Sequence, residues 1–134
     1  MQHSILSPAN LPKKIFISTK LKGDDLKKSI LNWIKNKSIK DNDYKIFDNG
    51  LIYLFFKSDR VINEKSLCFD INFNLEYDKF IVDFSNTKLL NIETKNIEDL
   101  KFNIWDTLMN SGWFREYNNS ITQITKELEN IINE

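Results

Sequence analysis

Side chains that could carry out chemistry are few in this sequence. The only histidine is His3, and the only cysteine is Cys68. Nucleophilic catalysis by serine or cysteine needs a positioned base, for which histidine is the usual choice. His3 lies in the stretch Met1–Pro12, which has two prolines and no periodic pattern, so we expect it to belong to a flexible tail. The sequence therefore predicts no catalytic triad and no cysteine–histidine pair.

The spacing of possible ligands predicts no bound metal and no cofactor. A zinc site takes three or four His, Cys or acidic ligands, and the chain has no pair of cysteines. The acidic stretch 41–49 lacks the spacing of an EF-hand and its terminal glutamate, so we expect a turn there. The only glycines, Gly23, Gly50 and Gly112, are too far apart to form a phosphate-binding loop.

Carboxylates and amides alternate with apolar residues along Leu67–Tyr77. Eleven residues of strict alternation predict a half-buried strand with one polar face. Two carboxylates about 5–10 Å apart could hydrolyse a glycosidic bond. In the expected register, however, the two aspartates of this face lie on neighbouring strands without facing each other. The polar face is therefore a candidate binding surface, made by Asp70, Asn72, Asn74, Glu76 and Asp83.

Aromatic residues after Gly112 form a second candidate binding surface. We expect Phe114 to pack inward and Trp113 to be the more exposed of the two, since Gly112 lets the backbone turn just before it. Trp113 and Tyr117 are then candidate contacts for a protein partner, because Trp and Tyr are enriched in interface hot spots. Cys68 lies on the polar side of its strand without a nearby base, so we expect an unreactive thiol.

The elements that position these residues begin with a strand at Lys14–Thr19 and a helix from Asp24 to Lys37. Asn49 and Gly50 lie between two apolar runs, which predicts a hairpin with a two-residue loop and Phe47 opposite Ile52. Leu51–Phe56 is apolar on both faces and is expected to be a central strand.

A second hairpin follows, because the alternation resumes at Phe80 after Tyr77. A two-residue loop would place Leu75 opposite Val82 and Phe73 opposite Phe84. The remaining chain is expected to be helical. Asn96 is expected to cap a helix whose inward residues are Ile97, Leu100, Ile104, Trp105 and Leu108. Ser120 is expected to begin a last helix whose apolar stripe is Ile121, Ile124, Leu128 and Ile131.

These elements predict an α+β fold with two layers, in which helices cover one face of a curved antiparallel sheet. The order strand, helix, four strands and helices resembles a bacterial family of unknown function with a TATA-binding-protein-like fold. The resembling region is roughly residues 14–90, and includes Leu26 and Trp33 in the first helix, the Asp48–Gly50 turn and the long hairpin around Tyr77. The family has no established activity, so the resemblance implies no functional residue.

Composition limits the function classes. The chain has 134 residues and equal numbers of basic and acidic residues, 19 each, which disfavours a general nucleic-acid binder. Only Arg60 and Arg115 are arginine, which disfavours sites that read phosphate or carboxylate groups. We expect one domain at residues 13–134 after a tail at 1–12, without a membrane span.

These observations favour a non-catalytic binding or protein-interaction module that is a monomer or a weak dimer. Two alternatives stay open, an inhibitor or immunity-type protein that blocks a partner, and a small carboxylate-dependent hydrolase. The N-terminus lacks the pattern of a secretion signal. Members of the resembling family often carry export signals, so we expect a cytoplasmic protein, or an exported one if a leader has been removed.

Overall fold

The structure is a computed structural model that describes residues 13–37, 43–76 and 79–133. In these residues, six strands form one antiparallel sheet with the order β1-β5-β4-β3-β2, and β6 also pairs with β5. The strands are β1 (Lys13–Ser18), β2 (Tyr44–Ile46), β3 (Leu51–Ile62), β4 (Lys65–Leu75), β5 (Lys79–Asn91) and β6 (Ile97–Asp99), and the helices are α1 (Gly23–Lys37), α2 (Ile104–Met109) and α3 (Gly112–Ile132).

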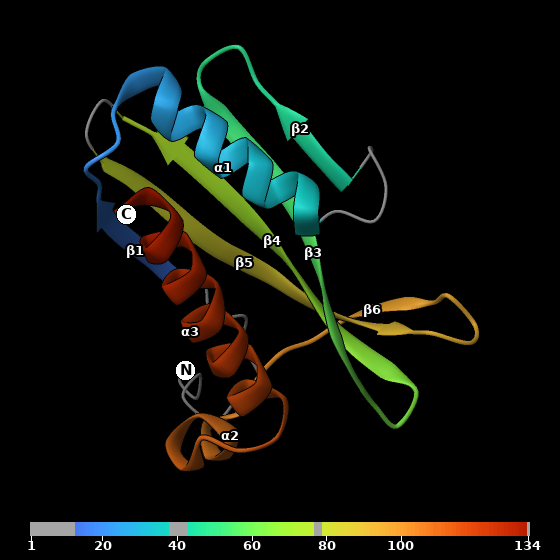
Figure 1. Ribbon diagram of the computed structural model, residues 1–134. Helices are drawn as coiled ribbons and strands as arrows, with labels where there is room; N and C mark the ends of the chain where they lie inside the picture. The colour runs from blue at the N-terminus through green and yellow to red at the C-terminus, as the bar shows by residue number, and fades with distance from the viewer. Residues whose placement is uncertain (1–12, 38–42, 77–78, 134) are drawn as a thin grey trace, which may run out of the picture.

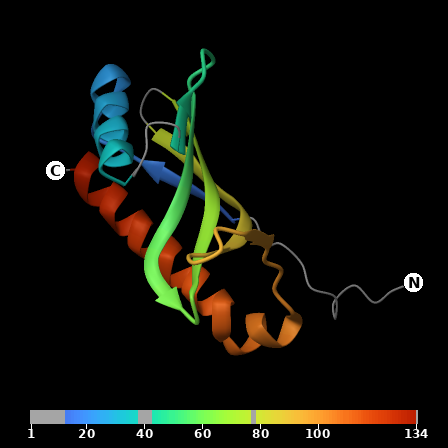
Figure 2. The ribbon, with the colours of Figure 1, turned by 90° about the vertical axis from the view of Figure 1, so that its right-hand side faces the viewer.

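The sheet is curved, and both long helices, α1 and α3, lie on the same face of it (Figures 1 and 2). The described chain thus has two layers, helices on one side and strands on the other, and the predicted α+β class is confirmed. The expected tail at residues 1–12, with His3, and the centre of the second hairpin at residues 77–78 lie outside the described residues.

The first strand and the first helix are formed as predicted. On β1, Ile17 is buried whereas Phe16 is 68% exposed, as the alternation requires. Helix α1 begins with two aspartates in its first turn. Their negative charge stabilises the helix there, because the N-terminal end of the helix dipole is positive. Its buried stripe consists of Leu26, Ile30, Trp33 and Ile34.

Aromatic contacts join the two layers into one core. The ring of Phe69 on β4 lies 5.4 Å from the ring of Tyr117 on α3 and 6.0 Å from the ring of Phe84 on β5. Trp33 of α1 contacts Phe73 of β4 edge-to-face at 6.1 Å. Such pairs add to the stabilisation from burial alone. The side chains that point from the sheet toward the helices are therefore the core, and their neighbours in sequence point to the opposite face.

The predicted register of the β2–β3 hairpin is wrong by one residue. Ile46, and not Phe47, faces Ile52. The loop is closed by a hydrogen bond from the Phe47 N–H to the Leu51 carbonyl oxygen at 2.8 Å, so it contains three residues instead of two. Its last residue, Gly50, has φ +87°, the conformation that completes a three-residue loop.

The predicted register of the β4–β5 hairpin is wrong by two residues. Leu75 faces Phe80, and Phe73 faces Val82. A shift of two residues leaves every side chain on its predicted face, because the period of a strand is two. The alternation on β4 is confirmed for the apolar residues up to Phe73, which are buried, whereas Leu75 is partly buried.

The helix expected from Asn96 onward is not formed in that segment. Residues Ile97–Asp99 are instead the edge strand β6, which pairs with the end of β5. The contact continues beyond the strand, since the Leu100 N–H donates to the Thr87 carbonyl oxygen at 3.0 Å. Beyond the part of β5 that pairs with β1, the backbone of β5 offers an edge, and hydrogen bonding to that edge overrides the helical periodicity of the sequence.

The C-terminal helix α3 begins earlier than predicted. It runs without interruption from Gly112 to Ile132, so Ser120 lies inside the helix and does not begin it. Asn110 ends α2 with φ 48° and ψ 57°, and Gly112 has φ +60°, which lets the chain change direction between the two helices. The predicted stripe is confirmed for Ile121, Ile124 and Leu128, which are buried, while Ile131 is partly buried.

Candidate functional site

The polar residues predicted to share one face lie on the side of the sheet away from the helices. Asp70, Asn72 and Asp83 are half-buried, whereas Asn74 and Glu76 are exposed. The alternation alone predicts that Asp70 and Asn72, on the polar face of β4, are mostly exposed. This prediction is wrong in degree, since both are half-buried. The register places Asn72 opposite Asp83, and Asp70 opposite Ser85.

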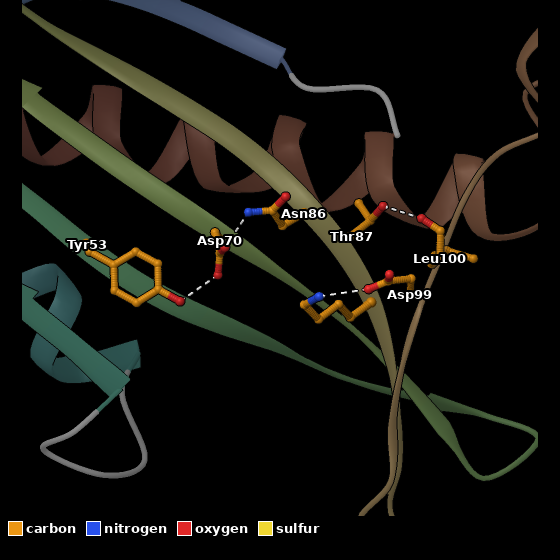
Figure 3. A network of polar contacts seen from close by, with 7 residues as sticks. Tyr53, Asp70, Asn86, Thr87, Asp99 and Leu100 are labelled. Carbon is orange, nitrogen blue, oxygen red and sulfur yellow. Dashed lines mark hydrogen bonds and ion pairs between the residues drawn. The ribbon is translucent and has the colours of Figure 1, made fainter. Parts of the chain in front are cut away.

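Asp70 is the centre of a hydrogen-bonded cluster on this face, shown in Figure 3. The Tyr53 hydroxyl donates to Asp70 Oδ1 at 2.5 Å, and Asn86 Nδ2 donates to Asp70 Oδ2 at 2.8 Å. Burial raises the pKa of the Tyr53 phenol, and the hydrogen bond to Asp70 raises it further. Both carboxylate oxygens thus accept a hydrogen bond from the sheet itself.

A bulge in β5 brings Asn86 to this position. The register between β4 and β5 shifts between Cys68 and Asp70, and Asn86 has φ 55°. A left-handed conformation is accepted more readily by asparagine than by most other residues. Tyr53 comes from β3, so the cluster links three neighbouring strands, and its geometry is that of a rigid structural contact.

The carboxylates of this face do not form a facing pair. Asp83 lies opposite Asn72 and has an ion pair with Lys14 at 3.9 Å. Asp70 lies one row away, opposite Ser85. Asp70 and Asp83 do not face each other, as predicted, and across the described part of this face no carboxylate lies directly opposite another.

A second polar group holds β6 against β5 (Figure 3). Lys88 Nζ lies 2.9 Å from Asp99 Oδ1, and the Thr87 hydroxyl donates to the Leu100 carbonyl oxygen at 2.7 Å. The hydrogen bond and charge of Lys88 lower the pKa of the Asp99 carboxyl. These contacts fix the chain just before α2.

Cys68 is fully buried, although its position in the alternation puts it on the polar face. Burial raises the pKa of its thiol to about 11, against the opposing charge of Lys57. Such a thiol holds little thiolate at neutral pH. Over the described ranges, no group of three or more His, Cys, Asp or Glu side chains could hold a metal ion. None of the helices in those ranges is long and apolar enough to cross a membrane.

The aromatic candidates on α3 belong mainly to the core. Tyr117 is 1% exposed, so it cannot contact a partner, and its role as a binding residue is excluded. Trp113 and Phe114 are both partly buried and pack against the core, so they do not differ as predicted. The prediction began the last helix only at Ser120, whereas α3 already includes this segment and turns Phe114 and Tyr117 toward the same side.

Three of the most exposed large apolar side chains among the described residues lie instead on α2. Trp105 and Leu108 are each 68% exposed, and Met109 is 72% exposed. Their spacing of i, i+3 and i+4 puts them on one face of the helix. The sequence prediction turned Trp105 and Leu108 inward, which is wrong. Periodicity shows that one face is apolar but not which way that face points. We call Trp105, Leu108 and Met109 the α2 patch.

The α2 patch stands on a well-anchored base. Asn103 Oδ1 accepts a hydrogen bond from the Asp106 N–H at 2.8 Å and caps the start of the helix. Just before the cap, Phe102 is 2% exposed and its ring stacks on Tyr117 at 5.5 Å and contacts Phe114 at 5.4 Å. At the other end of α2, the Asn110 N–H donates to the Asp106 carbonyl oxygen, so the helix that carries the patch is capped at both ends. In the sequence, only Asn103, as a possible N-cap, indicated where this helix begins.

Comparison with known proteins bears on the fold. No protein-family model matches the chain, and no curated protein matches it. It is similar to the crystal structure of a TBP-like protein from Parabacteroides distasonis, with a TM-score of 0.51 and 12% sequence identity. The match covers 69% of this chain and 65% of that chain, so this chain accounts for less than two thirds of the other. The similarity, together with the curved open sheet and its helices, shows that this chain has a TATA-binding-protein-like fold.

Proposed function

We propose that this protein is a non-catalytic interaction module that binds a partner protein through the α2 patch. The observation that carries the proposal is the exposure of Trp105, Leu108 and Met109 together on one short helix. Helix α2 has no buried residue at all. A helix of six residues that contributes none of its side chains to the core is maintained by its caps and by its neighbours, so its apolar face serves no internal packing.

The energetic argument supports a protein partner. Burying one side chain of this size contributes about 1.5–3 kcal/mol, so covering all three contributes roughly 5–9 kcal/mol before the cost of association. Tryptophan is the residue most enriched at the centre of protein interfaces. Because the caps already hold the backbone of α2 in place, little backbone entropy is lost when a partner covers the patch.

The test compares capture by the wild-type protein with capture by a triple variant, Trp105→Gln, Leu108→Gln and Met109→Gln. Affinity-tagged protein is incubated with a lysate of the source organism, and captured proteins are identified by mass spectrometry. The captured protein is then purified, and its binding is measured by calorimetry. We expect the triple variant to unfold at nearly the same temperature, because exposed positions tolerate change, and to lose binding. The wild type is expected to bind with a negative heat-capacity change.

A matched control is Phe16→Gln, since Phe16 is as exposed as Trp105 but lies on β1 at the other face of the sheet. We expect this variant to bind like the wild type. Binding that survives the triple substitution would reject the α2 patch, and loss of binding in the Phe16 variant would move the interface to the open face of the sheet. Loss of self-association in the triple variant, without any captured partner, would identify the partner as a second copy of the chain.

A further inference from the structure

The two arginines of the chain meet at one place. Arg60 lies on β3 and Arg115 in the first turns of α3, and both line a cavity of about 240 Å³. Ile62 and Trp113 form its apolar wall. Among the described residues that line it, Glu116 is the only acidic one. The end of β3, at residues 60–62, and the first turns of α3, at residues 112–116, are far apart in sequence and line this cavity together. We call this space the arginine cavity.

Glu116 orients one arginine and leaves the other available. Arg60 Nε lies 3.3 Å from Glu116 Oε1, while the Arg60 side chain remains 67% exposed and the Glu116 side chain only 14%. An arginine held through Nε keeps its two terminal amino groups for another acceptor. Arg115 is exposed and has no ion pair with any residue that the structure describes. The charged groups of the arginine cavity therefore leave one positive charge without compensation.

The start of α3 adds little to this positive potential. The helix has no acidic side chain in its first turn, and the side chain of Ser111 makes no capping hydrogen bond. The unpaired N–H groups of a first turn favour negative charge nearby. The carboxylate of Asp106 on α2 already lies there, since the Ser111 hydroxyl donates to Asp106 Oδ1 at 3.5 Å, so the positive charge of the arginine cavity comes from Arg60 and Arg115.

A second cavity continues from the first. It has about 290 Å³, lies between β3 and α3, and shares Arg60 and Glu116 with the arginine cavity. Its lining contributes hydrogen-bonding side chains along both walls: Ser58, Asn119, Ser120 and Gln123. Asp59 and Glu127 also line it, and so does Lys37, which forms an ion pair with Glu127 at 2.9 Å. This second cavity therefore has no excess of positive charge. Together the two cavities form a trough with the two arginines at one end and hydrogen-bonding side chains along the rest.

We propose that this trough binds an extended acidic segment of a partner protein. A carboxylate of the segment lies against Arg60 and Arg115, an apolar neighbour contacts Trp113, and the backbone of the segment runs between β3 and α3 toward Gln123. A peptide fits these features better than a free anion, because the hydrogen-bonding walls extend well beyond the arginines. This site is separate from the α2 patch and is tested independently of it.

The probe is an acetylated and amidated hexapeptide of sequence SNSLEE, compared with the same peptide carrying glutamine in place of both glutamates. Binding to the full chain is measured by calorimetry, and the contact is located from nitrogen-15 chemical shifts of the Arg60 and Arg115 Nε groups and the Trp113 indole. We expect the acidic peptide to shift these three signals and to bind at least about fivefold more tightly than its neutral counterpart at low salt.

The variants are Arg115→Gln, with Lys126→Gln as the matched control. Both remove one positive charge from an exposed position of α3, but Lys126 does not line either cavity. We expect Arg115→Gln to weaken the acidic peptide about fivefold, Arg115→Lys to restore part of the affinity, and Lys126→Gln to bind like the wild type. Unchanged melting temperatures are expected, because neither position is buried.

Three results would overturn the proposal. Equal losses for Arg115→Gln and Lys126→Gln would show a response to net charge alone. Equal affinity for the acidic and neutral peptides would remove the role of the carboxylate, and shifts produced as fully by inorganic phosphate as by the peptide would reduce the site to a simple anion site. The triple α2 variant is expected to bind the peptide normally, so failure of this site and failure of the α2 patch are distinguishable.

Discussion

The hydroxyl group of Tyr117 donates a hydrogen bond to the backbone carbonyl oxygen of Phe84 at 3.2 Å. This contact joins α3 to β5 across 33 residues of sequence, at the point where the Tyr117 ring also stacks on Phe102. Burial raises the pKa of the phenol to about 12, so it stays protonated and remains a donor throughout the neutral range. The helix layer, the sheet and the base of α2 are thus connected through one side chain.

Tyr117→Phe is expected to lower the free energy of unfolding by about 1 kcal/mol, because it removes one buried hydrogen bond and keeps the ring. Tyr117→Ala is expected to cost about 3–5 kcal/mol, since the ring itself packs against Phe69 and Phe102. Urea unfolding followed by circular dichroism measures both. A Tyr117→Ala protein as stable as the wild type would contradict this packing.

Phe73→Ala is expected to destabilise the protein by about 3–5 kcal/mol, because Phe73 is fully buried between the sheet and Trp33. Asn74→Ala, at the next position of the same strand, changes an exposed side chain and is expected to stay within about 0.5 kcal/mol of the wild type. Equilibrium unfolding in urea compares the two. Similar losses in both variants would show that the two faces of β4 are not distinguished by burial.

Glu127 makes stability depend on pH. Burial favours the protonated carboxyl, but hydrogen bonds from Lys37 at 2.9 Å, from Trp33 Nε1 at 3.0 Å and from Gln123 at 3.3 Å outweigh it, so the pKa lies below its ordinary 4.5. A pKa that is lower in the folded state stabilises the protein above the unfolded pKa, and this contribution is lost as the pH falls through the folded pKa.

We therefore expect Glu127→Gln to be less stable than the wild type at neutral pH, with a difference that shrinks as the pH falls below about 4.5. Glu129→Gln serves as control, because Glu129 is exposed on the same helix. Urea midpoints measured at several pH values test the expectation. A difference between wild type and Glu127→Gln that grows toward acid pH would have the wrong sign for this account.

The thiol of Cys68 is expected to react slowly in the native protein. With a pKa of about 11, its thiolate fraction at pH 8 is more than about 100-fold below that of an ordinary cysteine, and burial further limits access. The rate of reaction with an aromatic disulfide reagent, followed by absorbance, measures this. The same protein in guanidinium chloride is the control and should react at the ordinary rate. Fast reaction of the native protein would mean that the surroundings of Cys68 open readily.

The sequence by itself determined which residues share a face. Strict alternation in β4 identified the buried row through Phe73, and the spacing Leu26, Ile30 and Trp33 identified the buried stripe of α1. These predictions succeed because the periods of strand and helix are properties of the local backbone. Alternation also identified the polar face with Asp70 and Asn72. The order of the expected elements was enough to show the resemblance to the TATA-binding-protein-like fold.

Register and direction were decided only by the tertiary structure. Alternation restricts a strand pairing to steps of two residues, so it could not separate Leu75–Phe80 from Leu75–Val82. The edge of β5 turned residues 97–99 into a strand, and the core accepted Phe102 and Tyr117 instead of Trp105. The α2 patch and the meeting of Arg60 with Arg115 depend on distant segments lying side by side, and such long-range contacts leave no periodic signal in the chain.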